Sequence, residues 1–136
     1  MFLPYTRAAS VGSFKRPVAA AAADVTPNAV NWNDVVSALS ATTNTVTITG
    51  INTAINLSIS YTGYGTGAFS VYKNGTEFDL TGDNPTTLSV SNNDQVYFFY
   101  SPQSPSTVSV TVSNASDGNT VLDTFTMAAA QDGGGG

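Results

Sequence analysis

Apolar and polar residues alternate with a period of two from Thr45 almost to the end of the chain. Such alternation predicts β-strands that bury one face and expose the other. Turn-forming sequences separate the alternating segments at short, regular spacing, which is typical of an all-β sandwich. The predicted strands cover residues 45–49, 55–61, 68–73, 76–80, 86–90, 95–100, 107–112 and 120–127.

The strongest local signal is the dipeptide Asn-Gly at positions 74 and 75, between two short alternating segments. A two-residue hairpin loop of type I′ needs a positive φ at both central residues, and this dipeptide tolerates it. A loop of that length sets Val71 opposite Phe78 and leaves Tyr72 on the outer side, facing Glu77. The hydrophobic pattern therefore agrees with the predicted register.

The most hydrophobic predicted strand, QVYFFY at 95–100, has large side chains on both faces. If Val96, Phe98 and Tyr100 point into the core, Tyr97 and Phe99 point outward. Large aromatic side chains on a solvent face favour a partner surface. Tyr97 and Phe99 are therefore candidate interaction residues. The alternative for Tyr97 is a tyrosine corner, in which the hydroxyl bonds nearby backbone.

Two segments do not follow the simple pattern. In TVLDTFTM, residues 120–127, strict alternation buries Asp123, and a β-bulge near this residue removes the conflict. Upstream, NAVNWNDVV predicts a first strand around 29–36. We expect Trp32 to be a core residue, because a lone tryptophan in a sandwich is more often core than a platform for stacking sugars.

The chain divides into three parts. Residues 1–27 show no strand or helix period and form an extended basic and alanine-rich arm, residues 28–130 form the sandwich, and residues 131–136 are a glycine tail. Such an arm can lie along neighbouring subunits, with its aromatic and aliphatic side chains in apolar pockets and its cations on acidic groups. The candidate arm contacts are Phe2, Leu3, Tyr5, Arg7, Phe14, Lys15 and Arg16.

The residue types argue against an enzyme. The chain has no cysteine and no histidine, which removes disulfides, thiol chemistry and the usual general base and metal ligand. Its acids are scattered over turns and tails. Asp83, Asp94 and Asp117 lie in loops that lack the ligand spacing of a calcium loop. We therefore predict no catalytic residue, no cofactor and no metal site.

Charge and hydropathy limit the partners. The net charge is −5, and the acids are concentrated after the arm, so no nucleic-acid partner is expected. No stretch reaches the roughly 20 apolar residues of a membrane span, so no membrane partner is expected. The arm also lacks the strongly apolar run of a signal peptide, although a cleaved signal ending at the alanine run is the alternative.

Several segments together resemble a known module. TPNAVNW, TVTITGIN, SVYKNGTEF, NNDQVYFFY, TVSVTVSN and LDTFTM resemble the immunoglobulin-like β-sandwich of bacterial surface proteins and phage virion proteins, over about residues 25–127. The resemblance implies a single immunoglobulin-like antiparallel β-sandwich that binds or displays and has no active site.

A single copy behind a basic arm departs from the tandem repeats of surface proteins and favours a virion component. The expected function is that of a capsid decoration or cement protein of a phage, assembled in the host cytoplasm. Its expected partners are the major capsid protein, other virion subunits or a second copy of the chain. The alternative is a carbohydrate- or cell-surface-binding immunoglobulin-like module of a fibre or adhesin.

Overall fold

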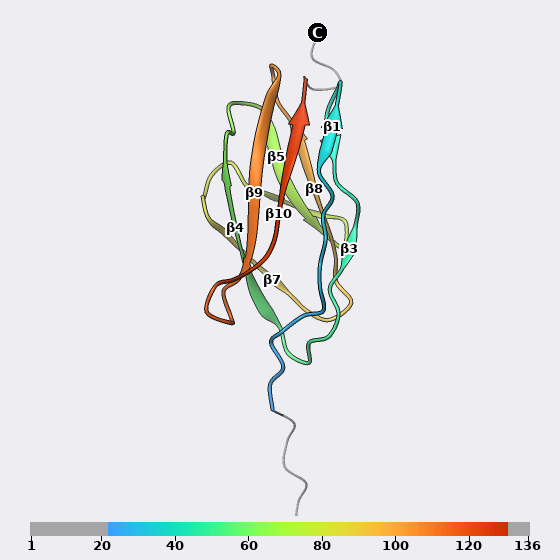
Figure 1. The fold of residues 1–136 in the computed structure, drawn as a ribbon, viewed down its shortest axis with the longest axis vertical. Helices are drawn as coiled ribbons and strands as arrows, with labels where there is room; N and C mark the ends of the chain where they lie inside the picture. Colours follow the sequence, from blue (N-terminus) through green and yellow to red (C-terminus); the bar gives the residue numbers. More distant parts are fainter. Residues whose placement is uncertain (1–21, 131–136) are drawn as a thin grey trace, which may run out of the picture.

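The computed structural model describes residues 22–130, and these form two packed β-sheets (Figure 1). Sheet A has the strand order β1-β10-β9-β4-β7, and sheet B the order β2-β8-β5-β6, with β3 also paired to β8. No helix occurs in residues 22–130. The predicted all-β sandwich architecture is confirmed. The strands are β1 Val35–Ser37, β2 Ala41–Thr42, β3 Val46–Thr47, β4 Ile55–Thr62, β5 Ala68–Lys73, β6 Thr76–Asp79, β7 Thr86–Val90, β8 Gln95–Ser101, β9 Ser106–Asn114 and β10 Thr120–Ala129.

The first strand is shorter than the sequence predicts and begins later. No strand forms at residues 22–34, so the prediction of a strand at 29–36 is wrong except at its end, where β1 pairs in parallel with β10. Carboxylates take the place of ladder bonds before that point. Asp123 Oδ2 accepts the backbone N–H of Trp32 at 2.7 Å, and Asp34 Oδ1 accepts that of Thr126 at 2.8 Å.

A bulge in β10 directly precedes the first of these carboxylates. The register against β9 shifts between Val121, opposite Ser113, and Asp123, opposite Val112. Leu122 is the extra residue, so Val121 turns outward, while Asp123, opposite the buried Val112, stays on the inward side together with Phe125 and Met127. The predicted bulge near Asp123 is confirmed. The bulge does not turn Asp123 outward, however: its half-buried carboxylate remains on the inward side and accepts the backbone N–H of Trp32.

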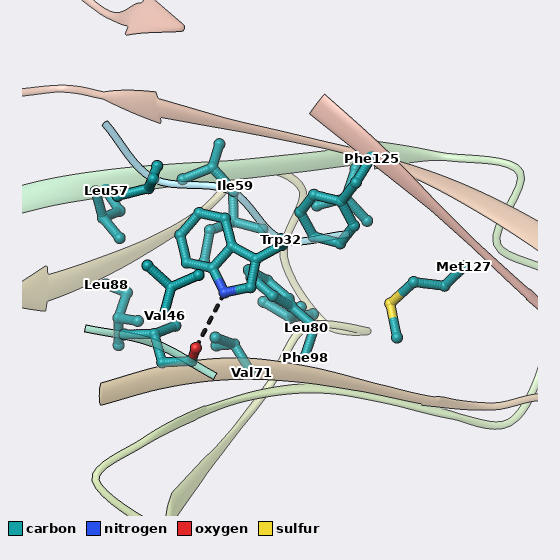
Figure 2. Close-up of a cluster of buried hydrophobic side chains, with 14 of the residues drawn as sticks. Trp32, Val46, Leu57, Ile59, Val71, Leu80, Leu88, Phe98, Phe125 and Met127 are labelled. Carbon is teal, nitrogen blue, oxygen red and sulfur yellow. Dashed lines mark hydrogen bonds between the residues drawn. The ribbon is translucent and has the colours of Figure 1, made fainter. Parts of the chain in front are cut away.

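Trp32 lies between the two sheets and is only 1% exposed, as predicted for a core residue. Its indole Nε1 donates to the Val96 carbonyl at 3.0 Å. The ring meets Phe98 edge-on at 5.3 Å between centroids and lies 5.9 Å from Phe125 (Figure 2). Val96, Phe98 and the other inward-facing residues of β4, β7, β8 and β9 are buried around it, in agreement with the alternating pattern.

The hairpin of β5 and β6 has the predicted register. Val71 lies opposite Phe78 and Tyr72 opposite Glu77. The two loop residues have φ angles of 53° at Asn74 and 85° at Gly75, as a type I′ turn requires.

The positive φ at Gly75 generates a prediction. A Cβ added there meets nothing within 4 Å, so Gly75→Val tests backbone strain alone. We expect a loss of about 1–2 kcal/mol in the free energy of unfolding, measured by urea titration, because a side chain disfavours the left-handed region. Gly82→Val is the control, since Gly82 is equally open and its φ is not positive. Equal stability of the two variants would contradict the assigned turn.

The carboxylate at the bulge generates a second prediction. Asp123→Ala should lower the free energy of unfolding by about 1–3 kcal/mol, because it leaves the backbone N–H of the buried Trp32 without an acceptor. Asp117→Ala is the control, since Asp117 is exposed in the β9–β10 turn. A chemical denaturation curve of each variant measures the difference. An Asp123→Ala protein as stable as the control would contradict this role.

Candidate functional site

The seven candidate contacts of the arm lie outside the described residues. What the structure describes is the point at which the chain joins the sandwich. Asn52 accepts the N–H of Asp24 at 2.6 Å and donates to the Ala22 carbonyl at 3.0 Å, and Asn114 donates to the Val25 carbonyl at 2.7 Å. Residues 22–25 are therefore bound to one pole of the sandwich by side-chain amides.

The candidate aromatic residues of β8 do face outward. Tyr97 and Phe99 lie half-buried on the outer face of sheet B. The structure adds Tyr72 of β5, which is directly opposite Tyr97. The two tyrosine rings stack with centroids 4.8 Å apart and planes inclined by 5°. The hairpin pattern already placed Tyr72 on an outer face, but the pairing of β5 with β8 is not visible in local sequence.

An open groove runs beside Tyr97 because the ladder along β8 is interrupted. Thr42 of β2 pairs with Phe99, and Val46 of β3 pairs with Val96. The three residues between them belong to neither strand. Thr43 fills the gap in the ladder: its hydroxyl accepts the N–H of Phe98 at 2.9 Å, and its N–H donates to the Phe98 carbonyl at 3.0 Å. The resulting hollow, of about 470 Å³, is here called the Tyr97 groove. It is lined by Thr42, Thr43, Thr45, Tyr72, Tyr97 and Phe99.

The Tyr97 groove is lined only by uncharged side chains. The charged residues of this face lie at its other edge, on β6, where Glu77 accepts the hydroxyl of Ser70 at 2.6 Å and Asp79 accepts that of Thr81 at 2.7 Å. Desolvation, and then the charge of Glu77 and the neighbouring Tyr97, raise the pKa of Tyr72. Like any tyrosine at physiological pH, Tyr72 is a neutral hydrogen-bonding group.

Two alternative interpretations of the aromatic residues are not borne out. Within residues 22–130 the Tyr97 hydroxyl makes no hydrogen bond, so Tyr97 is not a tyrosine corner. Trp32 is buried and offers no surface to a sugar. Tyr61 and Tyr64 pack against Phe69, and their hydroxyls donate to backbone carbonyls at 2.7 Å, which gives both rings a structural role.

Of the loop acids, Asp94 has the most defined role, and it is structural. Its carboxylate accepts the N–H of Ser91 at 2.7 Å and the side-chain amide of Asn74 at 2.8 Å, which joins the hairpin tip to the β7–β8 turn. Burial raises the pKa of Asp94, but these two hydrogen bonds and the charge of Lys73 outweigh it and hold that pKa below its usual value. In the part of the chain that the structure describes, no group of three or more acidic side chains is placed to hold a metal ion.

Comparison with known proteins leaves the function to be argued from this geometry. No protein-family model matches the sequence, and no curated protein matches it either. Among residues 22–130, no helix has the length and apolar character needed to cross a membrane.

The lowered pKa of Asp94 generates a prediction with a definite sign. A carboxyl whose pKa is lower in the folded than in the unfolded chain stabilises the fold above its unfolded pKa, and this contribution disappears as the pH falls through the folded pKa. Asp94→Asn should therefore cost on the order of 1 kcal/mol at pH 7. The cost should shrink in urea titrations below about pH 4, near the unfolded pKa. Asp117→Asn is the control, and a cost that does not change with pH would contradict the prediction.

Proposed function

We propose that this protein is a structural component of a phage virion, a capsid decoration or cement protein that is anchored by its N-terminal arm and displays an immunoglobulin-like domain. The observation that carries the proposal is the path of the chain. Residue 22 lies at one pole of the sandwich, and β10 ends at the opposite pole (Figure 1). An anchor that precedes residue 22 therefore holds the sandwich with its first pole toward the capsid surface and the end of β10 pointing away from it.

The connection at the first pole suits an anchored domain. Asn52 and Asn114 bind the backbone of residues 22–25, so a pull on the arm is transmitted to the end of β9 and to the segment that leads into β4. Asn114 is 1% exposed, which protects its bond from competition by water.

The strand order supports the immunoglobulin-like part of the proposal. In an immunoglobulin sandwich, strands C, F and G form one sheet, and B, E and D are neighbours in the other. Strands β4, β9 and β10 here have the succession and order of C, F and G, and β2, β8 and β5 those of B, E and D. Strands β6 and β7 extend the two sheets. The core tryptophan precedes β1 instead of lying on the strand equivalent to C.

The distribution of charge supports contact through the arm. Residues 22–130 contain eight acids against the single cation Lys73, whereas the arm contains Arg7, Lys15 and Arg16. The negative charge shared by all copies of the sandwich makes neighbouring copies repel one another. Attachment to acidic groups on the capsid is therefore assigned to the basic arm. The partners proposed are the major capsid protein or other virion subunits, and the role is binding rather than catalysis.

One observation favours a second candidate, a carbohydrate- or cell-surface-binding module of a fibre or adhesin. The Tyr97 groove combines an aromatic wall with hydroxyl groups and faces away from the core. Such a surface suits a ligand at the outside of a particle, and it is compatible with an anchored domain.

Deletion of residues 1–17 tests the proposed function. The deletion removes all seven arm contacts but keeps residues 22–25 and their hydrogen bonds. The free energy of unfolding should change by less than about 0.5 kcal/mol, because the proposal assigns the contacts of the arm to the partner and not to the sandwich. Purified full-length protein, added to virions that lack it, should sediment with them at fixed copy number, and the deletion variant should not.

The triple variant R7Q, K15Q and R16Q is the matched control for the deletion, because it keeps the apolar arm residues. Its attachment should weaken and lose most of its dependence on salt, since the charge pairs that salt screens are no longer formed. Attachment of the deletion variant at the same copy number as the full chain would refute the anchoring role.

A further inference from the structure

We propose that the Tyr97 groove binds an uncharged carbohydrate, with a pyranose ring lying flat against Tyr97 and its hydroxyls on the threonine side chains. This inference rests on the second candidate function and names its ligand class, and it depends on neither the arm nor a particle. It rests on the shape, chemistry and charge of six described residues.

One face of the Tyr97 ring is available to a ligand and is held in position. Tyr72 covers the other face, with the two rings almost parallel and 4.8 Å apart. The available face borders the groove, because Asn44 and Thr45, between β2 and β3, do not pair with β8. A ring already fixed by stacking loses little conformational freedom when a ligand binds, which favours affinity.

The side chains match the two kinds of surface that a sugar presents. The face of an aromatic ring is electron-rich and attracts the polarised C–H groups on one side of a pyranose. Tyr97 supplies such a face, and Phe99 adds apolar surface beside it. Threonine hydroxyls donate and accept hydrogen bonds, as sugar hydroxyls do. Thr42 and Thr45 are both exposed at the rim, where they can reach the equator of the ring.

The absence of charge in the lining selects among carbohydrates. None of the six lining residues is charged, so the groove offers no ion pair to a sulfate, a carboxylate or an amine. The surrounding domain is acidic, and Glu77 and Asp79 lie on the same sheet face, so anionic sugars are repelled. A neutral hexose or N-acetylhexosamine oligosaccharide is the remaining class.

The size of the groove favours a small ligand over a protein surface. Its volume of about 470 Å³ lies within the range of small-molecule sites, roughly 300–1,000 Å³. A stable protein interface instead needs about 800 Å² on each partner. Hydroxyl groups also line one side of the groove, whereas the centre of a protein–protein interface is usually dry and apolar. A protein contact is therefore the competing outcome of the test.

The test uses the full chain on an array of neutral hexose and N-acetylhexosamine oligosaccharides beside sialylated and sulfated ones. We expect binding to neutral members, and titration calorimetry with the strongest of them gives the affinity. Tyr97→Leu removes the flat face and should weaken binding at least tenfold. Tyr97→Phe keeps the face and should retain most of it, and Thr45→Val should weaken binding several-fold. Thr111→Val, on the outer face of sheet A, is the control and should bind like the parent.

Urea titration of each variant establishes that it is folded. Binding to acidic glycans alone, or to none, would overturn the proposal. Neutral binding that is unchanged in both Tyr97→Leu and Thr45→Val would also overturn it, because the sugar then lies elsewhere. Self-association of the parent that Tyr97→Leu abolishes, without glycan binding, would identify the groove as a contact between copies of the chain.

Discussion

The burial of Trp32 between the sheets, with both of its N–H groups hydrogen-bonded, is the interaction on which the rest of the structure depends. The residue lies in a segment that belongs to no strand, yet it contacts Phe98 of sheet B and Phe125 of sheet A. Its backbone donates to Asp123 and its indole to Val96, so one residue connects β10 to β8 across the core. A tryptophan can occupy such a position only if its polar groups find acceptors there.

The position of β8 links this core to the candidate site. Its inward residues form the wall against Trp32, and strict alternation then places Tyr97 and Phe99 on the outside. Both β2 and β3 pair with β8, but they are separate strands. Between them, the Thr43 hydroxyl accepts the backbone N–H of Phe98. The groove is therefore formed by the way in which two short strands, β2 and β3, pair with one well-anchored strand. No separate loop has to close over it.

The sequence alone predicts what depends on neighbours along the chain. The alternation locates the inward residues of β4 to β9, and Asn-Gly sets the register of one hairpin, since both signals are local. The strand expected at 29–36 begins only at Val35, because side chains at distant positions take up the backbone bonds before it: Asp123, 91 residues away, binds Trp32, and Asn44 binds Asn31 and Asn33. The outward positions of Tyr97 and Phe99 follow from alternation within one strand, which the sequence shows. Tyr72 and Thr43 lie beside them only because segments far apart in sequence pair with β8.

Because Trp32 is the only tryptophan, its fluorescence reports directly on the connection between the sheets. The most direct measurement follows this fluorescence and the far-ultraviolet circular dichroism of the strands in one urea titration. If the Trp32 segment is an integral part of the sandwich, both signals change together with a single midpoint, as in a two-state transition. A fluorescence change at clearly lower urea, while the strands remain folded, would contradict this account, because the segment then detaches without the sheets coming apart.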